Sequence, residues 1–378
     1  MERDNDKKTI RSVISSLKLK IIDWYIIRKF LGTFFFCLIL IMTIAVVFDF
    51  AEKIDNFMEK SAPWRAVIFD YYLNFIPYFA TLFAPLFVFI AVIFFTSRMA
   101  VNTEIIAILN SGMSFRRMMW PYFLSSLVIA LFIFYLTNFV IPQTALKRMD
   151  FEDKYYRPQW RKVNVENIHR QVYKNIYVYM ESYSPVYLRG RNFTIEQFND
   201  QGKLVSKLSS PSVLWDSISS KWIASNYTLR QINSNEEIVT RGVKIDTTLT
   251  IRPGDFSRDP GFVGTMTYRE LYDYIDLLKL QGSDELKVFL IEKHRRYAHP
   301  FAVFILTLIG VSLSSKKIRG GIGMSIGIGL ALSFSYILFL QFASQFSVKG
   351  NLNPMIAMWI PNLLYIVIAG VLYKLAPK

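Results

Sequence analysis

The hydrophobic residues of this chain gather in long uninterrupted runs, not at the spacing of amphipathic surface helices. Six runs of roughly 20 residues carry few charges, which is the length that crosses the hydrocarbon layer of a bilayer. They are Phe30–Phe48, Tyr71–Thr96, Met118–Ile141, Tyr297–Leu313, Ile322–Phe346 and Pro354–Tyr373. The pattern therefore predicts an integral membrane protein with six transmembrane helices, three within residues 1–145 and three within residues 286–378.

Between the third and fourth runs the pattern changes to a period of two, as in strands. The segment NIYVYMES alternates Ile176, Val178 and Met180 with tyrosines, and an Asn-Asp-Gln-Gly turn separates the two strands that follow it. Many short strands with frequent turns are typical of a sandwich or jelly roll. We expect an inserted all-β domain over residues 146–285.

The end of this insert returns to helical spacing before the chain re-enters the membrane. In TYRELYDYIDLLKLQG, the residues Leu271, Ile275 and Leu278 share one face, and Gly282 is a typical helix terminator. This segment is predicted to be a helical connection between the β domain and the fourth span.

The net charge of +15 is explained largely by topology. Lysine and arginine are concentrated before the first span, after the second span and after the fourth span, which fall on one side if there are six spans. The cations of the two loops are Arg98, Arg116, Arg117, Lys316, Lys317 and Arg319. By the positive-inside rule, both termini are cytoplasmic and the β domain lies on the opposite side. No nucleic-acid partner is needed to account for the charge.

The sequence contains little that suggests catalysis or metal binding. His169, His294 and His299 lack the spacing of a zinc site, and the single cysteine, Cys37, can form no intrachain disulfide. The cluster RGGIGMSIGIG lacks the Gly-Lys-Ser/Thr ending of a phosphate loop, so its Gly323-x-x-x-Gly327 spacing predicts close helix packing. We predict no catalytic residues, metal or cofactor, and a membrane enzyme is the weaker hypothesis.

The stretch VNTEIIAILNSGMSFRR, residues 101–117, predicts a short helix at the cytoplasmic surface. Its helix signals are two candidate caps, an acid, three aliphatic residues on one face and a terminating glycine: Asn102, Thr103, Glu104, Ile105, Ile106, Leu109 and Gly112. Ser114 can cap the third span. The helix, at about residues 101–111, is either an inert interfacial connector or a coupling helix that sits in a groove of a cytoplasmic motor subunit.

Three segments resemble one transporter family. They are WYIIRKFLGTFFF, the stretch PYFATLFAPLFVFIAVIFFTSRMAVNTEIIAILNSGMSFRRMMWP, and HRRYAHPFAVFILTLIGVSLSSKK. Together they resemble the LptF/LptG-type permeases of the lipopolysaccharide export ABC transporter, and the start of the first segment is closer to the G type. The resemblance covers essentially the whole chain, including the β insert.

This resemblance implies a division of labour in the bacterial inner membrane. A second LptF/LptG-type permease and a cytoplasmic LptB-type ATPase dimer, which binds the ATP, would complete the transporter. Single-span LptC-type and periplasmic LptA-type proteins would receive the lipopolysaccharide. The alternatives are a lipoprotein-release or efflux-type ABC permease, which usually carries its large domain after the first of four spans, and a non-transporting envelope scaffold.

Two sets of residues are candidates for contact with the lipid. Counting about 1.5 Å per residue across about 30 Å of hydrocarbon places five cations at the outer boundary: Arg295, Arg296, Lys147, Arg148 and Lys53. Guanidinium groups suit phosphate, although these side chains can also reach ordinary headgroups or pair with neighbouring acids. Ile176, Val178 and Met180 are candidates for an apolar lipid groove in the β domain, or for its ordinary core.

Glu104 is the residue that we expect to orient the motor contact, with Ile105, Ile106 and Leu109 packing beside it. A carboxylate at the tip of a docking helix can pair with a basic residue in the groove of the motor. The alternative is that Glu104 is a solvated helix cap.

Overall fold

The computed structural model describes most of the chain, and the described residues form two compact units. It describes residues 20–155, 165–184, 187–217, 219–233, 236–247, 249, 260–283, 285–316 and 321–376. The first unit comes from Met1–Glu52, Phe75–Val140 and His294–Lys378, and the second from Lys53–Asn74 and Ile141–Lys293. The part of the predicted charge bias that falls before residue 20, at Lys317 and at Arg319 lies outside the described residues.

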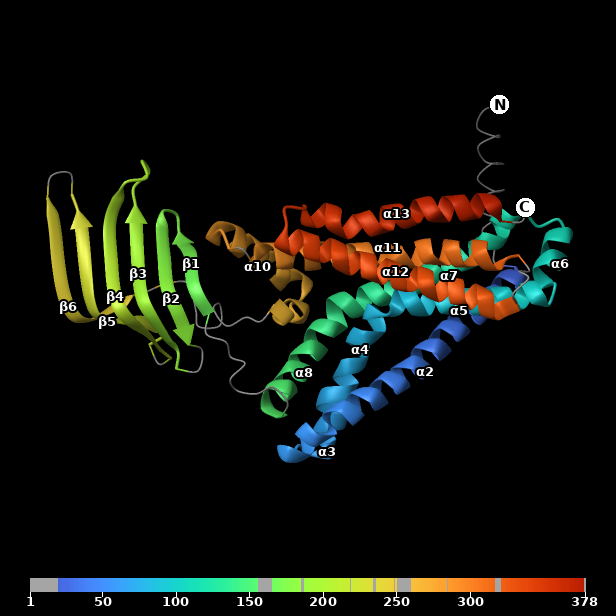
Figure 1. Ribbon diagram of the computed structural model, residues 1–378, viewed down its shortest axis with the longest axis horizontal. Helices are drawn as coiled ribbons and strands as arrows, with labels where there is room; N and C mark the ends of the chain where they lie inside the picture. Colours follow the sequence, from blue (N-terminus) through green and yellow to red (C-terminus); the bar gives the residue numbers. More distant parts are fainter. Residues whose placement is uncertain are drawn as a thin grey trace, which may run out of the picture. The chain divides into compact units, whose positions relative to one another are not determined.

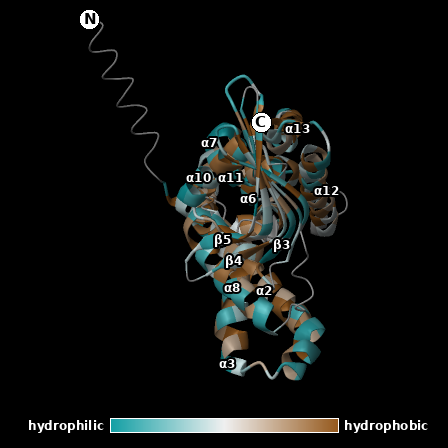
Figure 2. Cartoon of the chain, turned by 90° about the vertical axis from the view of Figure 1, so that its left-hand side faces the viewer, coloured by the Kyte–Doolittle hydropathy of each residue, from teal (hydrophilic) through white to brown (hydrophobic). Residues whose placement is uncertain are grey.

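Within the described part of the chain, six helices are long and apolar enough to cross a membrane, which confirms the predicted number of spans. The helices that carry these spans are α2 (Ile21–Glu59), α5 (Ala84–Val101), α7 (Phe115–Tyr135), α11 (Leu286–Ser314), α12 (Gly321–Lys349) and α13 (Pro354–Leu375). Large apolar side chains remain exposed along several of them, including α12 and α13. Figure 2, which colours each residue by its hydropathy, shows hydrophobic residues along the helices. Exposure on this scale suits a lipid solvent, in which an apolar surface costs nothing.

The second predicted span is broken where a continuous helix was expected. The π-helix η1 (Val67–Tyr72) and α4 (Leu73–Leu82) precede α5, and the helix is interrupted at Phe83. Pro85 lies in the first turn of α5, where the N–H that proline lacks would have no partner within the helix. Inside a continuous helix the same proline would remove a backbone hydrogen bond, so a break before it is favoured. The membrane span therefore begins at Ala84 and not at Tyr71. A short helix, α3 (Trp64–Ala66), follows α2 in the chain.

Aromatic stacking joins three helices of the first unit. The ring of Phe95 on α5 stacks on Phe30 of α2, with centroids 5.7 Å apart, and on Tyr122 of α7, with centroids 5.4 Å apart. The Tyr122 hydroxyl and the Thr96 hydroxyl are hydrogen-bonded at 3.0 Å, so the polar end of the buried ring is satisfied. α5 thus fixes the distance between α2 and α7.

Glycine allows two helices to approach α5 closely, but not at the predicted positions. A Cβ at Gly329 of α12 would collide with Ile93 and Phe89, and a Cβ at Gly310 of α11 would lie 2.9 Å from Val92. Gly323 and Gly327 have open space where a Cβ would be. Within this chain the close contact therefore lies at Gly329, and the expected helix packing at Gly323 and Gly327 stays a prediction.

An antiparallel sheet of six strands forms most of the second unit (Figure 1), which confirms the inserted all-β domain. The strands follow chain order: β1 (Val165–Tyr173), β2 (Ile176–Ser184), β3 (Arg189–Phe198), β4 (Leu204–Asp216), β5 (Lys221–Ile232) and β6 (Glu237–Thr247). The predicted turn between β3 and β4 is present, with Gly202 at φ +75°. Among the described residues the strands form one sheet and not the two layers of a sandwich.

A crease crosses all six strands at one level. One residue of each strand falls between the paired positions there: Asn167, Glu181, Asn192, Pro211, Asn226 and Val243. The three asparagines have φ between 46° and 53°, a left-handed conformation that asparagine adopts more readily than most residues. Pro211 has no N–H for the ladder, so an unpaired level is where a central strand tolerates it.

The crease reverses the alternation of side chains. Met180 and Tyr183 of β2 are three residues apart, yet both are buried in the same apolar cluster. In β4, Ser210 and Val213 show the same spacing, and the Ser210 hydroxyl lies 2.6 Å from the backbone carbonyl of Ser225, to which it donates. Each strand therefore turns two successive residues outward at the crease and keeps one apolar face along its whole length.

Three helices accompany the sheet in the second unit. They are α8 (Ile141–Tyr155), the 3₁₀ helix η4 (Pro260–Thr265) and α10 (Tyr268–Gln281). Of these, α10 contacts β1 while α8 contacts η4. α10 begins with a capping box between Thr267 and Glu270 and ends at Gly282 with φ +60°. The predicted face of Leu271, Ile275 and Leu278 is buried, so the expected helical connection is confirmed.

We expect the crease to depend on the left-handed backbone of its asparagines. Asn226→Val should lower the free energy of unfolding by about 1–2 kcal/mol, because a β-branched residue is strained at positive φ, whereas Asn226→Gly should be nearly neutral. Thr228→Val, two residues along β5, is the matched control. Thermal unfolding of the detergent-solubilised chain would measure the differences. Equal losses for the glycine and valine variants would contradict this account.

Candidate functional site

The short helix predicted after the second span is present as α6 (Glu104–Asn110), between α5 and α7 (Figure 1). It follows Thr103, whose φ of 62° turns the chain sharply, and it precedes Gly112 at φ +86°. Thr103 is the N-cap residue, one of the two candidates, but its side chain makes no capping hydrogen bond. Ser114 does cap α7, accepting a hydrogen bond from the Arg117 backbone N–H at 3.3 Å.

The apolar residues of α6 divide between the bundle and the surface. Ile105 is 1% exposed and belongs to the core shared by α2, α5 and α7, while Ile108 and Leu109 pack partly against that core. Ile106 is 53% exposed. Of the predicted contact residues, Ile105 anchors the helix and Ile106 offers its side chain outward.

Glu104 is held by neighbours from two elements. The Tyr25 hydroxyl of α2 donates to Glu104 Oε2 at 3.0 Å, and the Asn102 side-chain amide donates to Glu104 Oε1 at 3.2 Å. These groups are exposed, so the bonds orient the carboxylate more than they stabilise the fold. The carboxylate can still accept a charged partner from outside the chain.

An ion pair joins the first turn of α2 to the first turn of α7. Arg117 donates from Nη1 to Asp23 Oδ1 at 2.8 Å and from Nη2 to Asp23 Oδ2 at 2.5 Å. Asp23 is fully buried and also accepts from the backbone N–H of Lys20 at 2.7 Å. The planar guanidinium fits a carboxylate with two parallel bonds, so the pair fixes both distance and orientation.

Sequence reasoning missed this pair. It counted Arg117 only as a topology signal, and it gave Asp23 no role. No local signal pointed to it, because Asp23 lies before the predicted first span, which begins at Phe30. Together, the Asp23–Arg117 and Tyr25–Glu104 contacts link α2 to both ends of the α5–α7 connection. We call these four residues and α6 the α6 platform.

The five cations predicted at the outer boundary have different surroundings. Arg296 is only 3% exposed and Arg295 is half-buried. Lys53 donates to the Tyr71 hydroxyl, Arg148 pairs with Glu152 at 3.4 Å, and Lys147 is exposed. Arg296 is enclosed by protein, so in this conformation its guanidinium does not meet a headgroup. Lys147 has the open position that the prediction requires.

The predicted groove residues of the β domain lie on the apolar face of the sheet. Val178 and Met180 are buried in a cluster with Phe193 and Trp222, and Ile176, the first residue of β2, is half-buried. Gly190 faces this cluster, where a Cβ would lie 2.7 Å from the sulfur of Met180. Their assignment to a lipid groove stays a prediction.

Comparison with known proteins identifies the family. The family model described as lipopolysaccharide export system permease LptF/LptG matches residues 24–375. The lipopolysaccharide export system permease protein LptG of Haemophilus influenzae is similar, with 22% identity over 366 residues that cover 92% of this chain and 96% of that protein. The match spans all six helices and the β insert.

The Asp23–Arg117 pair should be energetically coupled. Asp23→Asn leaves a partly buried guanidinium without its counter-charge, and we expect the free energy of unfolding to fall by about 2–3 kcal/mol. Arg117→Gln should do the same, and the double variant should lose less than the sum of the two. Unfolding in mixed detergent micelles would measure the cycle. Strictly additive losses would show that the pair contributes no coupling.

Proposed function

This chain belongs to the LptF/LptG family of lipopolysaccharide export permeases, and from that premise we propose that it is one of two permease subunits of an ATP-driven lipid extractor. The partner permease is of the same type, and an LptB-type ATPase dimer supplies the energy. In this proposal the protein spans the bacterial inner membrane with both termini in the cytoplasm. The β domain is periplasmic and passes lipopolysaccharide to LptC-type and LptA-type proteins toward the outer membrane.

The α6 platform supports the coupling role. A helix that transmits force from a motor needs a surface that the motor can hold and a rigid connection to the membrane helices. Ile106 and Glu104 provide the first, because both are accessible at the end of the bundle. Ile105, buried in the core, and the Asp23–Arg117 pair provide the second. A movement of α6 therefore pulls on α2 and α7 together.

Nucleotide chemistry belongs to the partner in this proposal. The glycine cluster at residues 319–329 has no Gly-Lys-Ser/Thr ending, and α12 carries part of it as ordinary membrane helix. The permease thus needs no cofactor of its own, and ATP is bound and hydrolysed by the ATPase dimer.

The lipid route is proposed from charge and from the apolar face of the sheet. Lys147 is exposed and Arg295 partly so, which makes these two the better candidates for lipid phosphates, ahead of Arg296, Arg148 and Lys53. Acyl chains then need an apolar path through the periplasm. The face that carries Val178 and Met180 is continuous across the crease, so it offers such a path when its side chains separate.

We expect Glu104→Lys to uncouple ATP hydrolysis from lipid release. Reversing the charge should repel the basic residue of the motor, and stimulation of ATPase activity by lipopolysaccharide in the assembled complex should fall about tenfold. Ile106→Ala should give a smaller loss. Glu59→Lys, an exposed acid at the other end of α2, is the matched control. Normal stimulation in both α6 variants, with normal assembly, would remove α6 from the mechanism.

Photo-crosslinking along β2 would test the lipid route. A photoreactive residue at Val178 or Met180 should capture lipopolysaccharide only during ATP turnover, because the apolar face must open for the acyl chains. The same residue at Tyr177 or Glu181, whose side chains are exposed, should capture much less. If neither inward position captures lipid, this face is plain core.

A further inference from the structure

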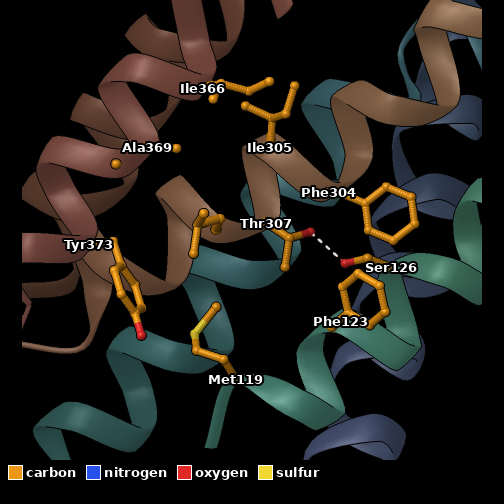
Figure 3. A pocket seen from close by; sticks show the side chains of 11 residues that line it. Met119, Phe123, Ser126, Phe304, Ile305, Thr307, Ile366, Ala369 and Tyr373 are labelled. Carbon is orange, nitrogen blue, oxygen red and sulfur yellow. Dashed lines mark hydrogen bonds between the residues drawn. The ribbon is translucent and has the colours of Figure 1, made fainter. Parts of the chain in front are cut away.

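An apolar groove lies within the first unit, between α7, α11 and α13 (Figure 3). Its volume is about 480 Å³. Its walls include Met119 and Phe123 of α7, Phe304 of α11, and Ala369 and Gly370 of α13. The site described above uses none of these residues.

The side chains that line the groove carry few polar groups, which are the hydroxyls of Ser126, Thr307 and Tyr373. The hydroxyls of Ser126 and Thr307 are hydrogen-bonded to each other at 2.9 Å, as Figure 3 shows. Ser126 also bonds the backbone carbonyl of Tyr122 at 2.9 Å, so its polar atom is satisfied within the protein. A ligand that fits here is apolar where it touches the walls.

The groove lies near the end of the bundle that carries α6. Met119 is four residues from the start of α7 at Phe115, and Tyr373 is two residues from the end of α13 at Leu375. At about 1.5 Å per residue, these residues are within roughly 6 Å of the helix ends. In the proposed orientation, this depth corresponds to the acyl chains of the cytoplasmic leaflet. Lipopolysaccharide in the outer leaflet would meet the other half of the bundle.

Two cations stand at the rim of the groove. Arg116 is three residues before Met119 and seven before Phe123, so it shares their helix face. Lys374 is four residues after Gly370 on α13, and both cations are exposed. Residues 111–149, 297–316 and 354–376, which include the groove walls, contain no aspartate or glutamate. The rim therefore attracts an anion at the level of the headgroups.

We propose that this groove binds one acyl chain of an anionic phospholipid from the cytoplasmic leaflet, with the lipid phosphate held by Arg116 and Lys374. The location in that leaflet rests on the orientation proposed above. A transmembrane helix fits less well, because a helix about 10–12 Å wide needs roughly 400 Å³ or more for each turn. The groove thus holds a single chain, and a bound lipid would fill the gap between α7 and α13.

Trp120 provides a reporter for the test, since its ring stacks on Phe123 with centroids 5.8 Å apart. The full chain would be placed in phosphatidylcholine nanodiscs with a small fraction of phosphatidylglycerol brominated on its acyl chains. Bromine quenches tryptophan fluorescence on contact. The part of the quenching that is lost in Trp120→Phe therefore reports on lipid at the groove. We expect brominated phosphatidylglycerol to quench at about tenfold lower fraction than brominated phosphatidylcholine, because its net charge draws it to the cationic rim.

Two variants and a matched control separate the contribution of the headgroup from that of the acyl chain. Arg116→Glu with Lys374→Glu should remove the preference for phosphatidylglycerol, whereas Arg28→Glu with Arg98→Glu, two exposed cations on α2 and α5, should preserve it. Gly370→Leu should reduce quenching by both lipids, because a side chain there enters open space and fills the groove.

Several outcomes would overturn the proposal. Equal quenching by the two lipids would do so, as would unchanged quenching in Gly370→Leu. Photo-crosslinks from Phe304 to a helix of another subunit, with no lipid captured, would assign the groove to protein. Stimulation of ATPase activity by lipopolysaccharide, measured on the same variants, reports separately on the proposed function and is expected to persist in Gly370→Leu.

Discussion

The first unit depends on the close packing around α5. The largest buried share of any span in the described chain, 78%, belongs to this helix, and only a narrow stripe with Phe94, Arg98 and Val101 is exposed. In a bilayer there is no hydrophobic force to press helices together, so contact area and small residues decide how they associate. Gly329 and Gly310 let two helices reach α5, and Phe95 joins two more through its ring.

That packing determines where α6 lies. α5 leads directly into α6, so the position of the short helix follows from the most constrained helix of the unit. Ile105 then seats α6 in the same core. The Asp23–Arg117 pair closes the arrangement from the opposite side by holding the first turns of α2 and α7 together. A short surface helix with only seven residues would not be stable alone, and here its neighbours supply its order.

The sequence predicted those features whose signals are local. Span number, the Ser114 cap and the α10 helix with its Gly282 end all follow from runs, spacing and capping residues within a few positions. Local sequence signals could not show that Asp23 and Arg117 meet, because the two residues are 94 positions apart in the chain. The inward position of Ile105 and the outward position of Ile106 depend likewise on where α5 places the helix.

Other misses have a different origin, in backbone conformation. The break at Phe83 could have been anticipated from Pro77 and Pro85, but hydropathy alone treats proline as neutral within an apolar run. In the sheet, period-two reasoning assumes a uniform extended backbone, and left-handed residues at the crease shift the phase of each strand. The asparagines at 167, 192 and 226 and the proline at 211 were visible, yet only the register shows that they share one level.

The two units solve opposite problems with apolar side chains. The membrane helices leave many of theirs exposed because lipid is their solvent, whereas the sheet must collect its own on one face away from water. A strand that simply alternated through the crease would send its remaining apolar residues to the wet side. By turning two residues outward at one level, each strand returns to the same face, and Met180 below the crease meets the same cluster as Tyr183 above it. The crease is thus what keeps the apolar surface of this sheet uninterrupted.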